Sequence, residues 1–330
     1  MKLFFGVSVV FGLAFGTLLI GYFGFEAVGE AFISAGWGMV VLAAYQGLSI
    51  GCSALAWRAV LRSVWRGPSR LFFWARWVRE AMNALLPVAQ VGGDIVGARL
   101  LAIKGAGSAV GGASVVVDKT IEVLTQFLFS IFGVGLILVV SADRSLGWSV
   151  AIALLIFGPL LVGFVVAQRM GMFHLLEKFL LKLEERSDWL SLGDVTGLHD
   201  TILRLYRDRG AIVTSTIYHL ITWILGIGEL WLAVHFMGYE VTLVAATIIE
   251  SLAQAVRSAG FFIPASLGVQ EGGYLLFGTM MGLSPEVALA LSLIRRVRHI
   301  LVGVPALLAW QFYEGRRIVV ARQNSVPPNS

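Results

Sequence analysis

Residues 83–94 are Asn83-Ala-Leu-Leu-Pro87-Val-Ala-Gln-Val-Gly92-Gly93-Asp94, and residues 260–271 are Gly260-Phe-Phe-Ile-Pro264-Ala-Ser-Leu-Gly268-Val-Gln-Glu271. In both stretches a carboxylate follows a proline by seven residues. The two prolines and the two carboxylates each lie 177 positions apart (264 − 87 and 271 − 94). The stretches therefore resemble two copies of one break in an apolar sequence. Within a membrane, irregular backbone persists only where protein or water covers it, so a repeated break predicts a binding site where two repeats meet.

The composition is that of a membrane protein. Of the 330 residues, 58% are hydrophobic and 14% are charged, and the mean hydropathy is +0.83, far from the mix of a soluble domain. Six stretches have the roughly 20 apolar residues that a spanning helix needs: 3–25, 36–57, 112–140, 148–167, 211–237 and 286–311. We predict an all-α polytopic membrane protein with six or more transmembrane helices. Residues 1–322 form its single integral membrane domain, and 323–330 a disordered tail.

The distribution of Lys and Arg predicts the orientation. Six arginines follow the second apolar stretch within residues 58–79, whereas the first loop carries Glu26 and Glu30. The connection 168–210 is also basic, and it alternates apolar and charged residues as an amphipathic surface helix does. The loop with the six arginines, the connection 168–210 and both termini are predicted to be cytoplasmic. Contact with anionic lipid accounts for the net charge of +5, so no nucleic-acid partner is expected.

The sequence offers no motif for a metal or a cofactor. The single cysteine, Cys52, lies inside the second apolar stretch and can make no internal disulfide. The five histidines are scattered along the chain without the spacing of metal ligands. We therefore expect neither a metal nor a cofactor.

Two apolar stretches are interrupted, 71–110 and 242–282, and we interpret each as a re-entrant hairpin. Each has an amphipathic first arm, a break at Pro87 or Pro264, and a return arm that contains glycine. Proline suits the break because it removes a backbone donor and disfavours helix in the residue before it. The break residues are Pro87, Gly92, Gly93, Pro264 and Gly268.

The 177-residue offset extends beyond the hairpins. It maps the second apolar stretch onto the fifth and residues 112–140 onto the end of the chain, which gives one repeat unit at 36–140 and another at 211–311. The charge rule gives the second and fifth stretches opposite directions, so we predict an inverted repeat. The alternative is coincidence in a chain rich in Leu, Val, Gly and Ala.

Charged residues in the last apolar stretch are the main candidates for a binding site. Arg295, Arg298 and His299 share one helical face, and Arg296 lies about 100° around the helix from Arg295. One arginine at the centre of a membrane helix costs about 2.5 to 3.5 kcal/mol, so these side chains must face protein, water or an anion. At the repeat-equivalent position, Asp118 and Glu122 form a second polar face with Gln126.

Two interpretations of these charges stay open. Either Asp118 and Glu122 pair with Arg295 and Arg298 across the core, or the arginine face holds the phosphate of a lipid or isoprenoid headgroup, which suits the guanidinium fork. The two are compatible if the pairs open when substrate enters.

The carboxylates at the breaks are similarly ambiguous. Asp94 and Glu271 either cap the helices that follow them, bind a cationic headgroup, or carry a coupling proton.

Other polar residues are predicted to lie at membrane depth. The pairs Arg79/Glu80 and Glu250/Arg257 lie on the first arms of the hairpins, and Asn83 opens the first break. We include Arg257 and Asn83 among the candidate substrate-binding residues. His219, Glu229 and His235 in the fifth apolar stretch are interpreted as interhelical hydrogen-bonding residues.

The second break carries a resemblance. Pro264-Ala-Ser-Leu-Gly268-Val-Gln-Glu271-Gly-Gly resembles the Pro…Gly-x-x-Glu signature of the lysylphosphatidylglycerol synthase transmembrane region family, the flippase-like membrane proteins. Asn83…Pro87…Gly93-Asp94 resembles the first hairpin motif of that family, with Asp94 at a place often held by Glu. The resemblance covers roughly residues 40–310. Within the family the chain is most similar to hopanoid-biosynthesis-associated integral membrane proteins.

The resemblance implies movement of lipids or lipid-linked intermediates between leaflets. We therefore expect a non-enzymatic lipid translocase, with a hopanoid-related role, in the bacterial inner membrane. Its partners would be a membrane lipid with an anionic or isoprenoid-derived headgroup, and enzymes of lipid biosynthesis. One alternative is a lipid-modifying enzyme such as a polyprenyl-phosphate glycosyltransferase, with Asp94, Asp118 or Glu271 as the catalytic carboxylate. The other alternative is a membrane scaffold for hopanoid biosynthesis.

Overall fold

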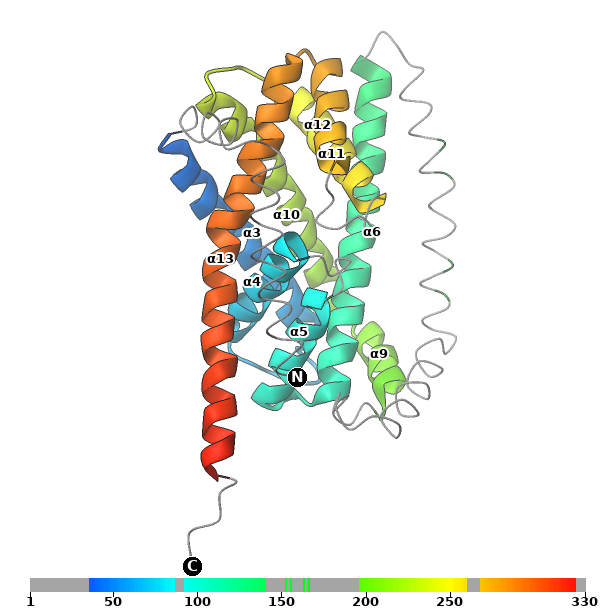
Figure 1. Ribbon diagram of the computed structural model, residues 1–330. Coiled ribbons are helices and arrows are strands. Elements are labelled where there is room, and N and C mark those ends of the chain that lie inside the picture. Colours follow the sequence, from blue (N-terminus) through cyan, green and yellow to red (C-terminus); the bar gives the residue numbers. More distant parts are fainter. Residues whose placement is uncertain are drawn as a thin grey trace, which may run out of the picture.

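The computed structural model describes residues 36–86, 92–140, 196–259 and 268–324, with four single residues at 152, 155, 163 and 166. Within these residues all regular structure is helical (Figure 1). The elements are α3 (Gly38–Val60), α4 (Ser69–Leu85), α5 (Gly92–Leu101), the π-helical turn η1 (Ala102–Ala106), α6 (Ser108–Val140), α9 (Leu198–Arg207), α10 (Arg209–Phe236), α11 (Leu243–Ala259), α12 (Val269–Met280) and α13 (Pro285–Asn324).

Helices α3 and α10 form an antiparallel pair. Gly38, at the start of α3, lies against Phe236 at the end of α10. At the other end, the Arg62 side chain after α3 donates 2.7 and 3.1 Å hydrogen bonds to Asp208, which precedes α10. Gly228 of α10 lies beside the Tyr45 hydroxyl of α3, where a larger side chain would collide. Small residues at helix contacts of this kind let membrane helices approach closely.

Two pairs of shorter helices lie inside the bundle. Helix α4 packs on α5, and α11 packs on α12. In Figure 1 the α4–α5 pair occupies the lower half of the bundle and the α11–α12 pair the upper half. Each pair contacts the long helix of the other half of the chain: α4 lies along α13, and α11 lies along α6. Glycine permits both contacts, because Gly303 meets Leu85 of α4 and Gly133 meets Ser251 of α11.

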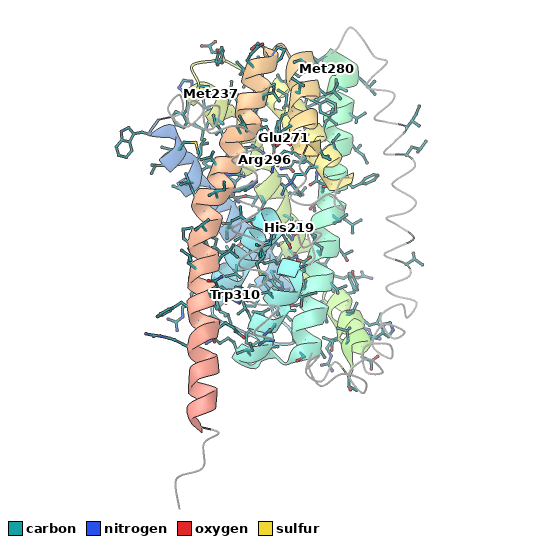
Figure 2. The ribbon with its side chains drawn as sticks, in the orientation of Figure 1. His219, Met237, Glu271, Met280, Arg296 and Trp310 are labelled. Atoms are coloured by element: carbon teal, nitrogen blue, oxygen red, sulfur yellow. The ribbon has the colours of Figure 1, made fainter. Side chains whose placement is uncertain are left out.

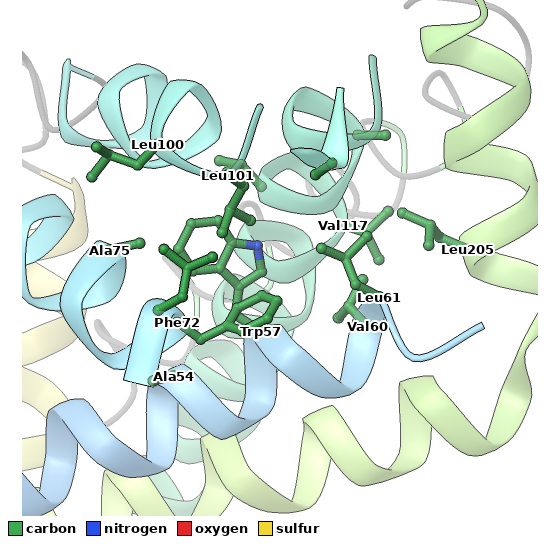
Figure 3. Close-up of a cluster of buried hydrophobic side chains, with 14 of the residues drawn as sticks. Ala54, Trp57, Val60, Leu61, Phe72, Ala75, Leu100, Leu101, Val117 and Leu205 are labelled. Atoms are coloured by element: carbon green, nitrogen blue, oxygen red, sulfur yellow. The ribbon is translucent and has the colours of Figure 1, made fainter. Parts of the chain in front are cut away.

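A hydrophobic core packs the α4–α5 pair against α3 and α6 (Figure 3). Trp57 of α3 is at its centre, edge-on to Phe72 of α4 with ring centroids 5.7 Å apart. The Trp57 indole N–H donates a 2.9 Å hydrogen bond to the Ser114 hydroxyl of α6, so the buried ring leaves no unsatisfied donor. Leu205 joins this core from α9. A second core, which includes Met39, packs α10 to α13 together.

Outward-facing apolar side chains cover the long helices. On α10, exposed positions recur at helical spacing: Val213, Ile217, Leu220, Ile221 and Ile224. Leu128, Ile131 and Phe132 form a similar surface on α6. An extended apolar surface over a polar interior is the arrangement expected of helices in lipid.

Three of the described helices are long and apolar enough to cross a membrane: α3, α6 and α10. They coincide with three of the predicted spans to within four residues at either end. Helix α13 matches the sixth predicted span and continues to Asn324, but it is not among the three. The first span and nearly all of the fourth lie outside the described residues. Six spans therefore stay a prediction.

The predicted connection and breaks are partly described. Helix α9 is the described part of the connection 168–210, and it is amphipathic as expected, with Leu198, Ile202 and Leu205 buried. Pro87, Pro264 and the tail 325–330 lie outside the described residues. The glycines after the breaks are described: Gly92 and Gly93 begin α5, and Gly268 precedes α12 with φ of 76°.

Candidate functional site

Eight polar side chains from four helices form what we call the first charged cluster. They are Arg76, Arg79 and Glu80 of α4, Asp94 of α5, Asp118, Lys119 and Glu122 of α6, and His219 of α10. Helix α4 presents the arginines because positions 76, 79 and 80 lie on one helical face. This face packs toward α5 and α6.

Asp118 is the centre of the first charged cluster. Its side chain is fully buried, and one of its oxygens accepts hydrogen bonds from Arg76 at 3.1 Å and Arg79 at 2.6 Å. The other oxygen lies 3.1 Å from Nε2 of His219. Asp118 therefore joins α6 to both α4 and α10.

The two arginines also contact other carboxylates. Arg76 donates to Glu80 at 2.7 Å and to Glu122 at 3.0 Å. Arg79 pairs with Asp94 at the start of α5. Arg79 and Asp94 therefore tie the two helices of the pair together beside the break.

Asn83 and Gly93 make a second tie between the same helices. The Asn83 side-chain oxygen accepts a 2.9 Å hydrogen bond from the Gly93 backbone N–H, one of the free donors at the start of α5. A Cβ at residue 93 would overlap the Arg79 carbonyl oxygen and the Asn83 side chain. The glycine therefore permits a close approach, and Asn83 links α4 to α5.

Nine polar side chains form what we call the second charged cluster. They are Glu229 of α10, Glu250 and Arg257 of α11, Glu271 and Tyr274 of α12, and Arg295, Arg296, Arg298 and His299 of α13. In Figure 2, Glu271 and Arg296 lie together above His219, which belongs to the first cluster.

Arg295 contacts groups from three other helices. Its guanidinium donates to Glu250 at 3.0 Å and to the Gly226 carbonyl at 3.2 Å, and it contacts the Tyr274 hydroxyl. The Tyr274 hydroxyl also lies 3.1 Å from Glu250, the carboxylate that Arg295 binds. Arg295 is 4% exposed. It therefore holds α10, α11, α12 and α13 together.

Arg298 pairs with Glu229 and donates a 2.6 Å hydrogen bond to Nε2 of His299. A guanidinium has no acceptor, so His299 must accept through an unprotonated Nε2 and is neutral in this contact.

Glu271 caps α12. One oxygen accepts a 2.8 Å hydrogen bond from the Gly268 backbone N–H, and the other pairs with Arg296 and lies 3.3 Å from the Ser292 hydroxyl. The capping interpretation of Glu271 is confirmed. Asp94 differs, because its described partner is the Arg79 side chain.

Arg257 stands apart from the other arginines. Its contact is with the Gln254 side-chain oxygen at 3.4 Å, and among the described residues no carboxylate pairs with it. Gln254 in turn donates a 3.0 Å hydrogen bond to Glu250. The neighbouring charges that act on Arg257 include Arg295, Arg296 and Arg298. Arg257 is therefore a partly buried cation that lies near other arginines of the second cluster.

The structure corrects the predicted ion pairs. Asp118 and Glu122 do not pair with Arg295 and Arg298: the two acids meet the arginines of α4, and the two arginines meet Glu229 and Glu250. The 177-residue offset places Asp118 and Arg295 at equivalent positions, and each occupies its own cluster.

Four residues of the two clusters have contacts that the sequence did not predict. Arg76 lies in a stretch predicted to be a basic loop, Tyr274 is not among the predicted site residues, and His219 and Glu229 are predicted to make interhelical hydrogen bonds. The sequence feature that indicates the first cluster is the spacing of Arg76, Arg79 and Glu80, which places all three on one face of an apolar helix. Among the described residues, no group of three or more His, Cys, Asp or Glu side chains is placed to hold a metal ion.

Apolar helices around two buried charged clusters define the class of this molecule, a multi-pass helical membrane protein with a polar interior. The family model described as the lysylphosphatidylglycerol synthase TM region matches residues 9–306, and the chain belongs to that family. No curated protein and no solved structure matches the chain. Family membership and the apolar helices indicate a membrane protein involved in lipid handling.

Proposed function

We propose that the protein is a non-enzymatic translocase that moves a lipid or lipid-linked intermediate with an anionic group between the leaflets of the membrane. The observation that carries the proposal is the excess of cations in the second charged cluster. Arg257, Arg295, Arg296 and Arg298 contribute four positive charges, and Glu229, Glu250 and Glu271 contribute three negative charges. The formal balance is 4 − 3 = +1 with His299 neutral.

An uncompensated positive charge inside a membrane protein is costly, so a bound anion would stabilise the second cluster. A phosphodiester carries one negative charge, and guanidinium groups bind phosphate through parallel hydrogen bonds. The family's link to lipid handling makes the phosphate of a lipid headgroup the proposed anion.

The contacts suggest a division of work among the arginines. Arg295, Arg296 and Arg298 are already committed to Glu250, Glu271 and Glu229, so they hold the cluster in shape. Arg257 has no carboxylate partner among the described residues and is the side chain that we assign to the phosphate. Its place in the last turn of α11, directly before the second break, puts it where a headgroup would pass.

We further propose that the two halves of the chain are an inverted repeat whose short helices form re-entrant hairpins. The matched contacts support this: α4 lies along α13 as α11 lies along α6, and the hairpins occupy opposite halves of the bundle (Figure 1). The 17 residues of α4 and of α11 span about 25 Å each, short of the roughly 30 Å hydrocarbon core. We place the protein in a bacterial inner membrane with both termini cytoplasmic.

The proposal is tested by lipid exchange between leaflets in liposomes that contain the purified protein. Wild type should exchange a fluorescent phosphatidylglycerol, and Arg257→Gln should reduce the rate about tenfold, the effect of losing one charge-assisted hydrogen bond worth about 1.5 kcal/mol. Arg204→Gln, which changes an exposed arginine on α9, is the matched control and should keep the wild-type rate.

The choice of probe separates the remaining alternatives. A hopanoid probe beside phosphatidylglycerol tests the hopanoid-related role. Failure of folded protein to exchange any lipid would refute the translocase. Chemical alteration of a lipid substrate by the purified protein would favour the enzyme. Loss of cellular function on changing only the basic surface would favour the scaffold.

A further inference from the structure

His219 lies in the interior of the first charged cluster. It projects from α10 and is 1% exposed, and its Nε2 lies 3.1 Å from the fully buried Asp118 carboxylate. Figure 2 shows it midway along the bundle, below the Arg296 and Glu271 pair. The proposed lipid site does not use this histidine.

The balance of charge in the first cluster is the reverse of that in the second. Glu80, Asp94, Asp118 and Glu122 contribute four negative charges, and Arg76, Arg79 and Lys119 contribute three positive charges. The formal balance is 3 − 4 = −1 without His219. A proton on His219 brings the cluster to zero, and histidine is the one side chain here that ordinarily changes charge between about pH 5 and 8.

Among the described residues, charged groups of three other helices surround His219. Helix α6 presents Asp118, Glu122 and Lys119, and helix α4 presents Arg76, Arg79 and Glu80 behind them. Helix α5 contributes Asp94 through Arg79. Helix α3 packs along α10 with the neutral Ser53 and Thr222 hydroxyls in contact at 3.3 Å. On α10 itself the next charge is Glu229, which Arg298 and Arg295 neutralise.

The histidines of the two charged clusters have opposite partners. His299 accepts a hydrogen bond from Arg298, which requires an unprotonated nitrogen. His219 faces a carboxylate, which accepts hydrogen bonds only, so the 3.1 Å contact requires a proton on Nε2. A second proton on Nδ1 makes the ring an imidazolium and adds a charge to that contact.

We propose that His219 is a proton-binding site and that its proton is coupled to lipid movement, a role that rests on the proposed function. Binding takes one proton from water onto the free ring nitrogen and breaks no bond. The imidazolium strengthens the link between α10 and Asp118, and Asp118 holds the α4 arm through Arg76 and Arg79. Loss of the proton weakens that hold and leaves the cluster with a buried negative charge.

Helix α10 connects this proton site to the lipid site. His219 and Glu229 are ten residues apart on it, about 15 Å along a continuous helix. Gly226, between them, accepts the Arg295 hydrogen bond through its carbonyl. A rigid helix that contacts both clusters transmits a change at His219 to the residues around Arg257.

The test uses full-length protein in liposomes with a pH difference of one unit across the membrane. With one proton coupled to each lipid, wild type should accumulate fluorescent phosphatidylglycerol in one leaflet up to about tenfold, because one unit is a tenfold ratio of proton activity. His219→Gln should equalise the leaflets regardless of the gradient. His235→Gln, on the exposed last turn of α10, should behave as wild type. Exchange by wild type that ignores the gradient would overturn the coupling and leave the translocase intact.

A second measurement does not depend on transport. In protein with ¹⁵N-labelled histidine, the signal that disappears in His219→Gln should show two protonated ring nitrogens when the proton is bound. A neutral ring throughout about pH 5 to 8 would overturn the proton site. If no lipid moves under any condition, the proposed function fails, and this spectrum alone decides whether His219 binds a proton.

Discussion

The two charged clusters share a plan and differ in sign. In each, a short helix pair brings charged side chains to a long helix of the bundle. In the first cluster both arginines come from the short helix α4 and two of the four acids from α6; in the second, two of the three acids come from the short helices α11 and α12 and three of the four arginines from α13. With both histidines neutral, the first cluster has a formal charge of −1 and the second cluster has a formal charge of +1. The same architecture therefore suits a cation on one side and an anion on the other.

The largest effect on stability is expected from Asp118, the acid that three side chains of the first cluster contact. Asp118→Asn removes the charge that faces Arg76, Arg79 and His219 in a fully buried position. Breaking a buried ion pair costs about 3 to 5 kcal/mol because the partner charge stays buried. We expect a loss of this size in denaturant unfolding of protein in detergent. The control Asp200→Asn changes an exposed acid on α9 and should leave stability unchanged; equal stability of the two variants would refute the central role of Asp118.

The second prediction compares the α4–α5 pair and the α11–α12 pair through their glycines. Gly93→Ala places a Cβ against the Arg79 carbonyl oxygen, whereas Gly272→Ala on α12 has no atom within 4 Å of the new Cβ. Overpacking of the first kind costs about 1 to 3 kcal/mol, and the second change should be neutral or stabilising. Thermal unfolding of both variants checks this. A matching loss in Gly272→Ala would contradict the difference in packing.

The third prediction concerns Asn83, for which we expect a smaller loss of stability. Asn83→Ala leaves the Gly93 N–H without its acceptor and should cost about 1 kcal/mol. Hydrogen exchange at the start of α5 should increase while exchange at the start of α12 stays constant, since Glu271 caps that helix. Unchanged exchange at residue 93 would show that water replaces the Asn83 oxygen.

The smallest effect lies outside the clusters, at the ends of the α3 and α10 pair. The Arg62 guanidinium and the Ala211 N–H lower the pKa of Asp208 to about 2, from an ordinary value of about 3.9. Its contribution to stability is therefore present above about pH 4 and is lost as the pH falls through about 2. The difference in melting temperature between wild type and Asp208→Asn should shrink in acid and in high salt, because the pair is exposed. A constant difference at every pH would contradict this.

The charged residues of the site could be predicted from the sequence, and their partners could not. Arg295 and Asp118 are conspicuous because charge is costly in an apolar helix. The regular offset even placed them at matched positions. Asp118 and Arg295 nevertheless lie in separate clusters, so the offset does not predict which side chains meet.

The partners depend on tertiary packing instead. Arg76 resembles one more residue of a basic loop until the fold brings its side chain to Asp118 of α6, and Glu229 resembles a lone polar residue until α13 brings Arg298 to it. The helix boundaries were predicted more closely, because apolar length and the glycine and proline breaks are local signals.

The excess cation in the second cluster is the central claim, and retention of lipid tests it most directly. Native mass spectrometry of protein purified in the presence of phosphatidylglycerol should show one retained lipid for wild type and for the control Arg204→Gln, and loss of that lipid for Arg257→Gln. Equal retention by all three proteins would contradict the assignment of Arg257 to the phosphate.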